Sequence, residues 1–129
     1  MLKFFFHIVN VIFIIFYIYP GSILGFFFYN NLYKQPSLTR DITLDVIHIS
    51  SNHIYCFLFL SIFGFIIFLK KNKKSILIYL FSISVILEIF HLFIPKRSFE
   101  LSDLTGNILG VILAFTLFNT YSYVKKNFI

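Results

Sequence analysis

Residues 54–94 read IYCFLFLSIFGFIIFLKKNKKSILIYLFSISVILEIFHLFI, which is two long apolar runs separated by a short segment with four lysines. A helix that crosses the roughly 30 Å hydrocarbon layer of a membrane needs about 20 mostly apolar residues. Both runs have this character, and the lysine segment between them is too short for a further element. The stretch therefore predicts two antiparallel membrane-spanning helices.

The composition of the whole chain agrees with a lipid environment. Of the 129 residues, 59% are hydrophobic and only 12% are charged, and the mean hydropathy is +0.90. Average soluble domains carry about a quarter charged residues. The sequence thus excludes a soluble enzyme, a disordered tail and a nucleic-acid-binding module, and no nucleic-acid partner is expected.

One further apolar run lies on each side of this stretch, so the sequence predicts four membrane spans in all. The loops between them are short, so residues 1–129 are expected to form one domain, an all-α antiparallel bundle. Pro20 and Gly21 predict a kink or a helix end in the first span. Lys3 and the apolar run behind it are also typical of a signal peptide, but no A-x-A-like site follows, so we expect the segment to be retained. The predicted spans are residues 4–28, 47–69, 75–94 and 104–123.

The positions of the basic residues predict the orientation in the membrane. Cytoplasmic loops are enriched in Lys and Arg. Seven basic residues fall on one side of the predicted bundle and four on the other, so both termini are expected in the cytoplasm. The segment Lys70–Lys74 is read as a topology anchor rather than as a lipid-headgroup site. The seven are Lys3, Lys70, Lys71, Lys73, Lys74, Lys125 and Lys126, and the four are Lys34, Arg40, Lys96 and Arg97.

All five acidic residues fall on the outer half of this arrangement, and Glu88 lies within a span. A carboxylate at that depth costs a few kcal/mol unless it is paired or protonated. It therefore needs a partner, either in a structural ion pair or in a functional site. Candidate partners are Arg97, His91, His48 and Asn52.

Two polar stripes follow helical spacing. If the second helix begins near Thr39–Asp41, one of its faces is polar. The fourth span has a second such face, on which Gly106 and Gly110 also permit close helix packing. The first face carries Asp41, Asp45, His48, Asn52 and Tyr55, and the second carries Asp103, Asn107, Gly110 and Ala114.

Two carboxylate and histidine pairs have a spacing that metal sites use. Asp45 with His48, and Glu88 with His91, are each three residues apart. A di-metal site in a helical bundle usually brings further bridging carboxylates. The first and fourth spans carry none at depth, so we expect no metal and no cofactor.

The stretch from Glu88 to Gly110, EIFHLFIPKRSFELSDLTGNILG, resembles the signature of the VanZ-like membrane proteins. A glutamate late in a span is followed there by proline, arginine, aspartate, asparagine and glycine. Pro20 and Gly21 also resemble a family feature of the first span. The matching positions are Glu88, Pro95, Arg97, Asp103, Asn107 and Gly110.

The chain departs from this pattern at two places. His91 stands where the family commonly has glutamine, and it can titrate as well as form a hydrogen bond. The second-span motif, an aspartate and lysine pair followed by histidine, is only partly present, because Val46 follows Asp45. Either His48 or His53 could correspond to the family histidine.

The resemblance implies a small four-span protein of the bacterial envelope, whose founding relative is associated with teicoplanin resistance. An outward-facing cluster would then hold a phosphate, sugar or peptide group, and Arg97 would clamp an anion because its fork suits phosphate or carboxylate. The predicted cluster consists of Asp45, His48, Glu88, His91, Arg97, Asp103 and Asn107.

Three functions are compatible with these residues. The leading one is a non-enzymatic envelope protein whose partners are membrane lipid and a cell-wall precursor or lipoglycopeptide. The second is an enzyme acting on a lipid-linked headgroup, with Glu88 or Asp103 as general base beside His48 or His91. A small multidrug exporter ranks last, because residues 4–28 contain no carboxylate. Assembly of several copies through Gly106 and Gly110 would suit either of the first two.

Overall fold

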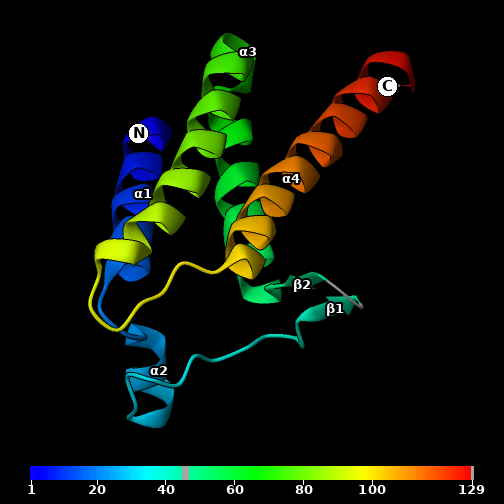
Figure 1. Cartoon of the computed structure of the whole chain (residues 1–129). Coiled ribbons are helices and arrows are strands. Elements are labelled where there is room, and N and C mark those ends of the chain that lie inside the picture. Colours follow the sequence, from blue (N-terminus) through cyan, green and yellow to red (C-terminus); the bar gives the residue numbers. More distant parts are fainter. Residues whose placement is uncertain (45–46, 129) are drawn as a thin grey trace.

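The computed structural model describes residues 1–44 and 47–128, without the side chains of residues 69–72 and 128. The described chain is mainly helical, as the composition predicts, but one small β-hairpin departs from the predicted all-α fold. In chain order the elements are α1 (Leu2–Ile18), α2 (Ile23–Tyr29), β1 (Ile42–Leu44), β2 (Ile47–Ile49), α3 (Ser51–Phe90), the 3-10 helix η1 (His91–Phe93) and α4 (Leu101–Phe128) (Figure 1).

The first apolar run is broken after α1. The helix ends at Ile18, and α2 is bent 78° away from it. Pro20 has no N–H with which to continue the helix, and Gly21 has a φ of +113°, which L side chains rarely adopt. The kink predicted at Pro20 and Gly21 is confirmed, whereas residues 4–28 do not form one continuous helix.

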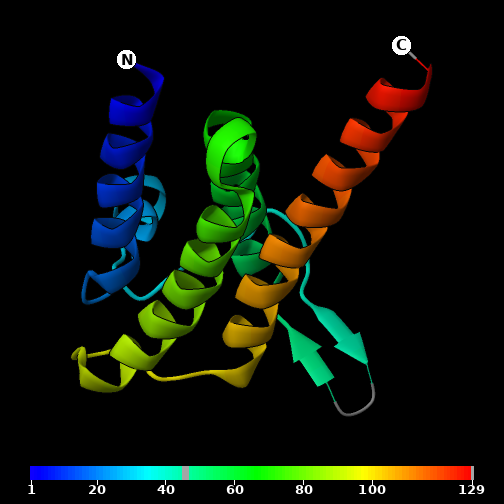
Figure 2. The same ribbon diagram turned by 90° about the horizontal axis from the view of Figure 1, so that it is seen from above.

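The long helix α3 doubles back on itself. A straight helix of its 40 residues would be about 60 Å long. Instead, a Cβ added at Gly64 would lie 3.4 Å from the side chain of Ile76, so the two halves run side by side. The chain reverses between Phe68 and Lys73, in the segment for which a loop was predicted, and Figure 2 shows the two halves from a second direction.

A β-hairpin takes the place of an early start of α3. Ile42–Leu44 pairs antiparallel with Ile47–Ile49, so that Thr43 faces His48 across the hairpin. Isoleucine and threonine favour extended backbone. The side chain of Asp41 accepts a hydrogen bond from the N–H of Ser51 at 2.8 Å, where α3 begins. The helical start predicted near Thr39–Asp41 is therefore wrong, and the polar face that depended on it does not form.

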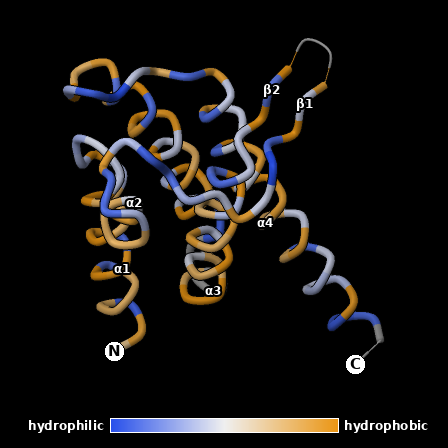
Figure 3. The backbone as a smooth tube through the Cα atoms, turned by 90° about the horizontal axis from the view of Figure 1, so that it is seen from below, coloured by the Kyte–Doolittle hydropathy of each residue, from blue (hydrophilic) through white to orange (hydrophobic). Residues whose placement is uncertain are grey.

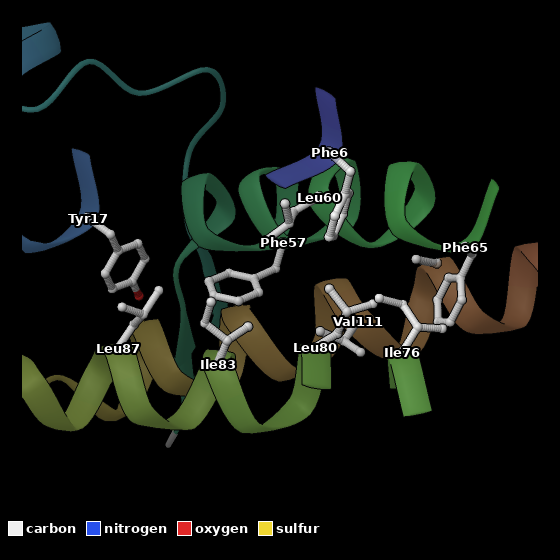
Figure 4. Packing of buried hydrophobic residues seen from close by; sticks show 11 residues of the cluster. Phe6, Tyr17, Phe57, Leu60, Phe65, Ile76, Leu80, Ile83, Leu87 and Val111 are labelled. Atoms are coloured by element: carbon white, nitrogen blue, oxygen red, sulfur yellow. The ribbon is translucent and has the colours of Figure 1, made fainter. Parts of the chain in front are cut away.

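The core lies between α1, the two halves of α3 and α4. Figure 4 shows Phe57 and Leu60 facing Leu80, with Val111 of α4 beside them. Close packing and small residues hold helices together in lipid, where the solvent is itself apolar. Ala114 is fully buried in this core, as its position on the predicted inner face of the last span requires.

Gly106 and Gly110 let α4 approach the first half of α3. A Cβ at Gly106 would lie 2.6 Å from the carbonyl oxygen of Ser50, and one at Gly110 would lie 2.6 Å from that of Ile54. These glycines are thus used within one chain. Because α3 covers this glycine face, a second copy of the chain could pack against it only after α4 separates from α3.

Three helical segments are long and apolar enough to cross a membrane, namely Ser51–Phe68, Lys73–Phe93 and Leu101–Asn127, and there are four if the bent pair α1 and α2 counts as one span. Hydrophobic residues follow these helices, while hydrophilic residues gather in the connections (Figure 3). Both termini and the reversal of α3 lie at the same end of the molecule, opposite α2 and the hairpin (Figure 1).

Candidate functional site

Glu88 lies in the last turn of α3 and is fully buried. The hydroxyl of Tyr17 in α1 donates to its Oε2 at 2.8 Å. The N–H of Glu100, just before α4, donates to its Oε1 at 3.1 Å. Three segments that are distant in sequence thus meet at this carboxyl group.

His91 is the third partner of Glu88. Its ring stacks on Tyr17, with 4.9 Å between the ring centroids. Its Nε2 lies 3.1 Å from the main-chain oxygen of Tyr17, and because a carbonyl oxygen only accepts, this nitrogen carries a proton. Its Nδ1 lies 3.3 Å from Oε1 of Glu88, and a hydrogen bond there needs a second proton. The contact between Glu88 and His91 therefore contains one proton, which either the carboxyl group or the imidazole ring can carry.

Asn107 links this pair to a second one. Its Nδ2 donates to the Tyr17 hydroxyl at 2.6 Å and to the carbonyl oxygen of Ser84 at 3.3 Å. The oxygen of Ser84 only accepts, so the amide orientation is fixed and Oδ1 of Asn107 faces Nδ1 of His53 at 2.9 Å. Nδ1 of His53 therefore carries a proton.

His53 and Asp103 form the second acid and base pair. Nε2 of His53 lies 3.3 Å from Oδ2 of Asp103, and the Tyr17 hydroxyl lies 2.9 Å from Nδ1 of the same ring. Since Nδ1 is protonated, the contact with Asp103 again holds one shared proton. The Tyr17 network is defined here as the six residues Tyr17, His53, Glu88, His91, Asp103 and Asn107.

Arg97 is held at the break between α1 and α2. It donates to the carbonyl oxygens of Tyr19 at 3.3 Å and of Gly21 at 2.6 Å. The break at Pro20 frees these carbonyls from helical hydrogen bonds, and in an apolar surrounding they need donors. Burial lowers the pKa of the Arg97 guanidinium, but arginine stays charged. Two of its N–H groups thus bind main-chain oxygens at the break between α1 and α2, and its remaining N–H donors stay available to an anion.

Two cavities adjoin the network. The larger has a volume of about 340 Å³ and mostly apolar walls, with Tyr17, His53, His91 and Arg97 among its polar lining residues. The smaller, of about 140 Å³, is lined by Lys96, Arg97, Glu100 and Asp103 among others. His53 and His91 of the network, together with Arg97 beside it, therefore face an apolar space, while Glu88 lines neither cavity.

Three residues of the network could hold a cation. One ligand atom each of His53, Glu88 and Asp103 lies within 4.8 Å of the others. This set differs from the two pairs noted in the sequence, because His48 lies elsewhere and Glu88 uses His91 as a hydrogen-bond partner. Chemically, the network offers two carboxylate and imidazole pairs suited to proton transfer.

The structure brings four of the predicted cluster residues into the network, Glu88, His91, Asp103 and Asn107, with Arg97 beside it. The prediction that includes His48 is wrong, because this residue is exposed on β2 opposite Thr43. Asp45 lies outside the described residues.

The predicted partners of Glu88 are partly right. His91 is a partner, whereas Arg97 binds carbonyl oxygens. Asn52 also points elsewhere and donates to the carbonyl oxygen of Pro36.

Sequence reasoning missed Tyr17 and Ser84 and left His53 undecided. The chain has 8 tyrosines, so nothing in the spacing distinguishes Tyr17 from the others. His53 lies four residues before Phe57 on α3, and only the approach of α4 shows that it faces Asp103 and Asn107.

Comparison with known proteins gives a family for this chain. A family model described as VanZ/LLP1 matches residues 4–122. No curated protein and no solved structure matches the chain.

Proposed function

The chain belongs to the VanZ/LLP1 family, and from this premise we propose that it is an integral cell-membrane protein with four antiparallel spans and cytoplasmic termini. Three membrane-length apolar helices and the broken α1–α2 pair support this number of spans. The excess of basic residues near the termini and the reversal of α3 supports the orientation. The shared end of both termini and this reversal in Figure 1 is compatible with it.

We propose further that the protein lowers the sensitivity of the cell to teicoplanin-type glycopeptides. One observation carries this proposal, namely that Glu88 and Asn107 of the family signature contact the hydroxyl of Tyr17, which Asp103 reaches through His53. In the proposed orientation this network faces outward, where such antibiotics and their cell-wall targets meet the membrane.

Binding rather than chemistry is the role that the burial of Glu88 favours. Its carboxyl group is fully buried and lines neither cavity, so a ligand cannot reach it directly. It instead orients Tyr17 and His91, which do line the larger cavity. The proposed mechanism is recognition of a polar group of a membrane ligand by these rings and by Arg97.

The His53–Asp103 pair supports a second candidate function, an enzyme acting on a lipid-linked headgroup. Asp103 lines the smaller cavity and lies 3.3 Å from Nε2 of His53, which is the arrangement of a carboxylate general base beside an imidazole partner. This function would need a nucleophile from the substrate or from water.

Survival of a susceptible host that expresses the protein tests the leading proposal. We expect protection against teicoplanin, measured as growth at graded antibiotic concentrations beside vancomycin, and we expect Glu88→Ala to abolish it. That variant leaves Tyr17 and His91 without their acceptor. Ile89→Ala is the matched control, because Ile89 is the next residue of α3 but its side chain is exposed and lines neither cavity.

Membrane insertion of each variant is checked by fractionation. Protection that persists in inserted Glu88→Ala would contradict the role of the network. Absence of protection by the inserted wild-type chain would contradict the resistance function and favour the enzyme.

A further inference from the structure

The two cavities beside the Tyr17 network meet along a common wall. Ser22, Gln35, His91 and Arg97 line both of them. The larger cavity is walled mainly by apolar side chains, and the smaller one mainly by polar and charged side chains. The two cavities are therefore adjacent, and they are called here the apolar part and the polar part. The volume of the apolar part, about 340 Å³, lies at the lower end of the range of roughly 300–1,000 Å³ typical of ligand sites.

The apolar part continues onto the exposed surface of the protein. Its rim includes Phe28 of α2, which is 70% exposed, and Leu38 of the connection to β1, which is 79% exposed. In the proposed orientation Phe28 lies at the outer end of the first span and Leu38 lies in the connection that follows it, at the outer surface of the membrane. This exposed apolar rim is suited to a hydrocarbon chain that enters the cavity from the outer leaflet.

The polar part carries two cations without an ion pair. Among the side chains that the structure describes, the ion-pair contacts are His53–Asp103 and His91–Glu88, and neither includes Lys96 or Arg97. The Lys96 ammonium instead lies 5.2 Å from the centre of the Tyr33 ring.

The acidic groups that face these cations are engaged elsewhere. Glu100 accepts hydrogen bonds from the hydroxyls of Ser98 and Ser102, and Asp103 contacts His53. Neither carboxylate contacts Lys96 or Arg97 as an ion pair, so these two cations keep N–H donors for an anionic group.

We infer that the two adjacent cavities bind one anionic membrane lipid across their shared residues, with one hydrocarbon chain in the larger cavity and the charged headgroup at Lys96 and Arg97. The inference rests on the proposed membrane function and names the ligand class of the same site. The volume and the exposed apolar rim of the larger cavity suit the hydrocarbon chain. Lys96 and Arg97, which take part in neither ion-pair contact named above, suit the headgroup.

Tryptophan fluorescence tests the inference directly, because the chain contains no tryptophan. Phe16→Trp places a reporter in the wall of the larger cavity. Phe59→Trp is the matched control, since Phe59 is 68% exposed on α3 and lines neither cavity. Each variant is placed in phosphatidylcholine vesicles in which a minor fraction of the lipid is brominated.

Brominated phosphatidylglycerol is expected to quench Phe16→Trp more strongly than brominated phosphatidylcholine does, and the two lipids should quench Phe59→Trp equally. Lys96→Gln should lower the preference for the anionic lipid about fivefold, as expected for one cation beside an anionic headgroup. Lys34→Gln should leave it unchanged, because Lys34 also lies over a tyrosine ring but lines neither cavity. Added inorganic phosphate should not relieve the quenching.

Equal quenching of Phe16→Trp by both lipids would overturn the inference, as would a preference that Lys96→Gln leaves intact. Full relief of the quenching by inorganic phosphate would show that the cations bind any phosphate group and that the hydrocarbon chain adds nothing to the binding, and it would also overturn the inference. The assay contains no antibiotic, so it is independent of the survival test. Loss of the lipid preference with intact teicoplanin protection would reject this inference alone.

Discussion

At the scale of single residues, Tyr17 joins the two acid and base pairs. Its hydroxyl donates to Glu88 and accepts from Asn107, while its ring stacks on His91. A buried polar group that loses its partner costs about 1–3 kcal/mol. The stability of the network therefore depends on one oxygen atom that belongs to none of the motif positions in the sequence.

Tyr17→Phe removes this oxygen and keeps the ring. We expect the free energy of unfolding to fall by about 2 kcal/mol, because Oε2 of Glu88 and Nδ2 of Asn107 each lose a hydrogen bond. The measurement is reversible unfolding in mixed detergent micelles. Tyr121→Phe, at an exposed tyrosine of α4, is the control and should not change the stability. Equal stability of Tyr17→Phe and the wild type would mean that the hydroxyl contributes nothing.

At the scale of elements, the close contact of α4 with the first half of α3 positions the network. This contact brings Asp103 and Asn107 to His53. Gly110 permits it, because a Cβ there would lie 2.6 Å from the carbonyl oxygen of Ile54 and 2.8 Å from the nitrogen of Leu58. Both atoms belong to the backbone of α3, so they cannot move aside as a side chain would.

Gly110→Ala should therefore destabilise the protein by about 2 kcal/mol. Overpacking lowers the free energy of unfolding by about 3 kcal/mol, and the better helix propensity of alanine offsets about 1 kcal/mol of this loss. Gly64→Ala is the matched control, since its Cβ would meet only side-chain atoms of Phe6 and Ile76 at 3.3 and 3.4 Å. The same unfolding assay compares the two. If Gly110→Ala is as stable as Gly64→Ala, the prediction is wrong, because α4 can then move away from α3 at little cost in free energy.

At the scale of the whole molecule, the functional proposals depend on which end faces the cytoplasm. The end with both termini carries more basic residues than the end with α2 and the hairpin. Basic residues near the ends of spans are retained in the cytoplasm. The Tyr17 network and both cavities would then open outward.

Cysteine labelling tests this orientation. The single native cysteine is first removed as Cys56→Ser, and a reporter is added as Lys34→Cys or Lys126→Cys. A membrane-impermeant maleimide should label Lys34→Cys on intact cells and Lys126→Cys only after lysis, because the first site is proposed to lie outside and the second inside. Labelling of Lys126→Cys on intact cells would contradict the proposed orientation.

The sequence by itself determined the apolar runs, the break at Pro20, the close-packing glycines and the motif from Glu88 to Gly110. These depend on composition and on local spacing, which act along one segment at a time. Periodicity shows which residues share a helix face, but not which faces meet. The helix start predicted near Thr39–Asp41 failed for a related reason, because extended pairing of Ile42–Leu44 with Ile47–Ile49 competes with the helix.

Only the tertiary structure decided the membership of the site. In the structure His53, and not His48, contacts Asp103, and Tyr17 is the common hydrogen-bond partner. Arg97 donates to the carbonyl oxygens of Tyr19 and Gly21. Each outcome arises from contacts between segments far apart in the chain. A buried donor or acceptor must find a partner wherever the packed helices provide one, and the packing of α1, α3 and α4 sets which partners are within reach.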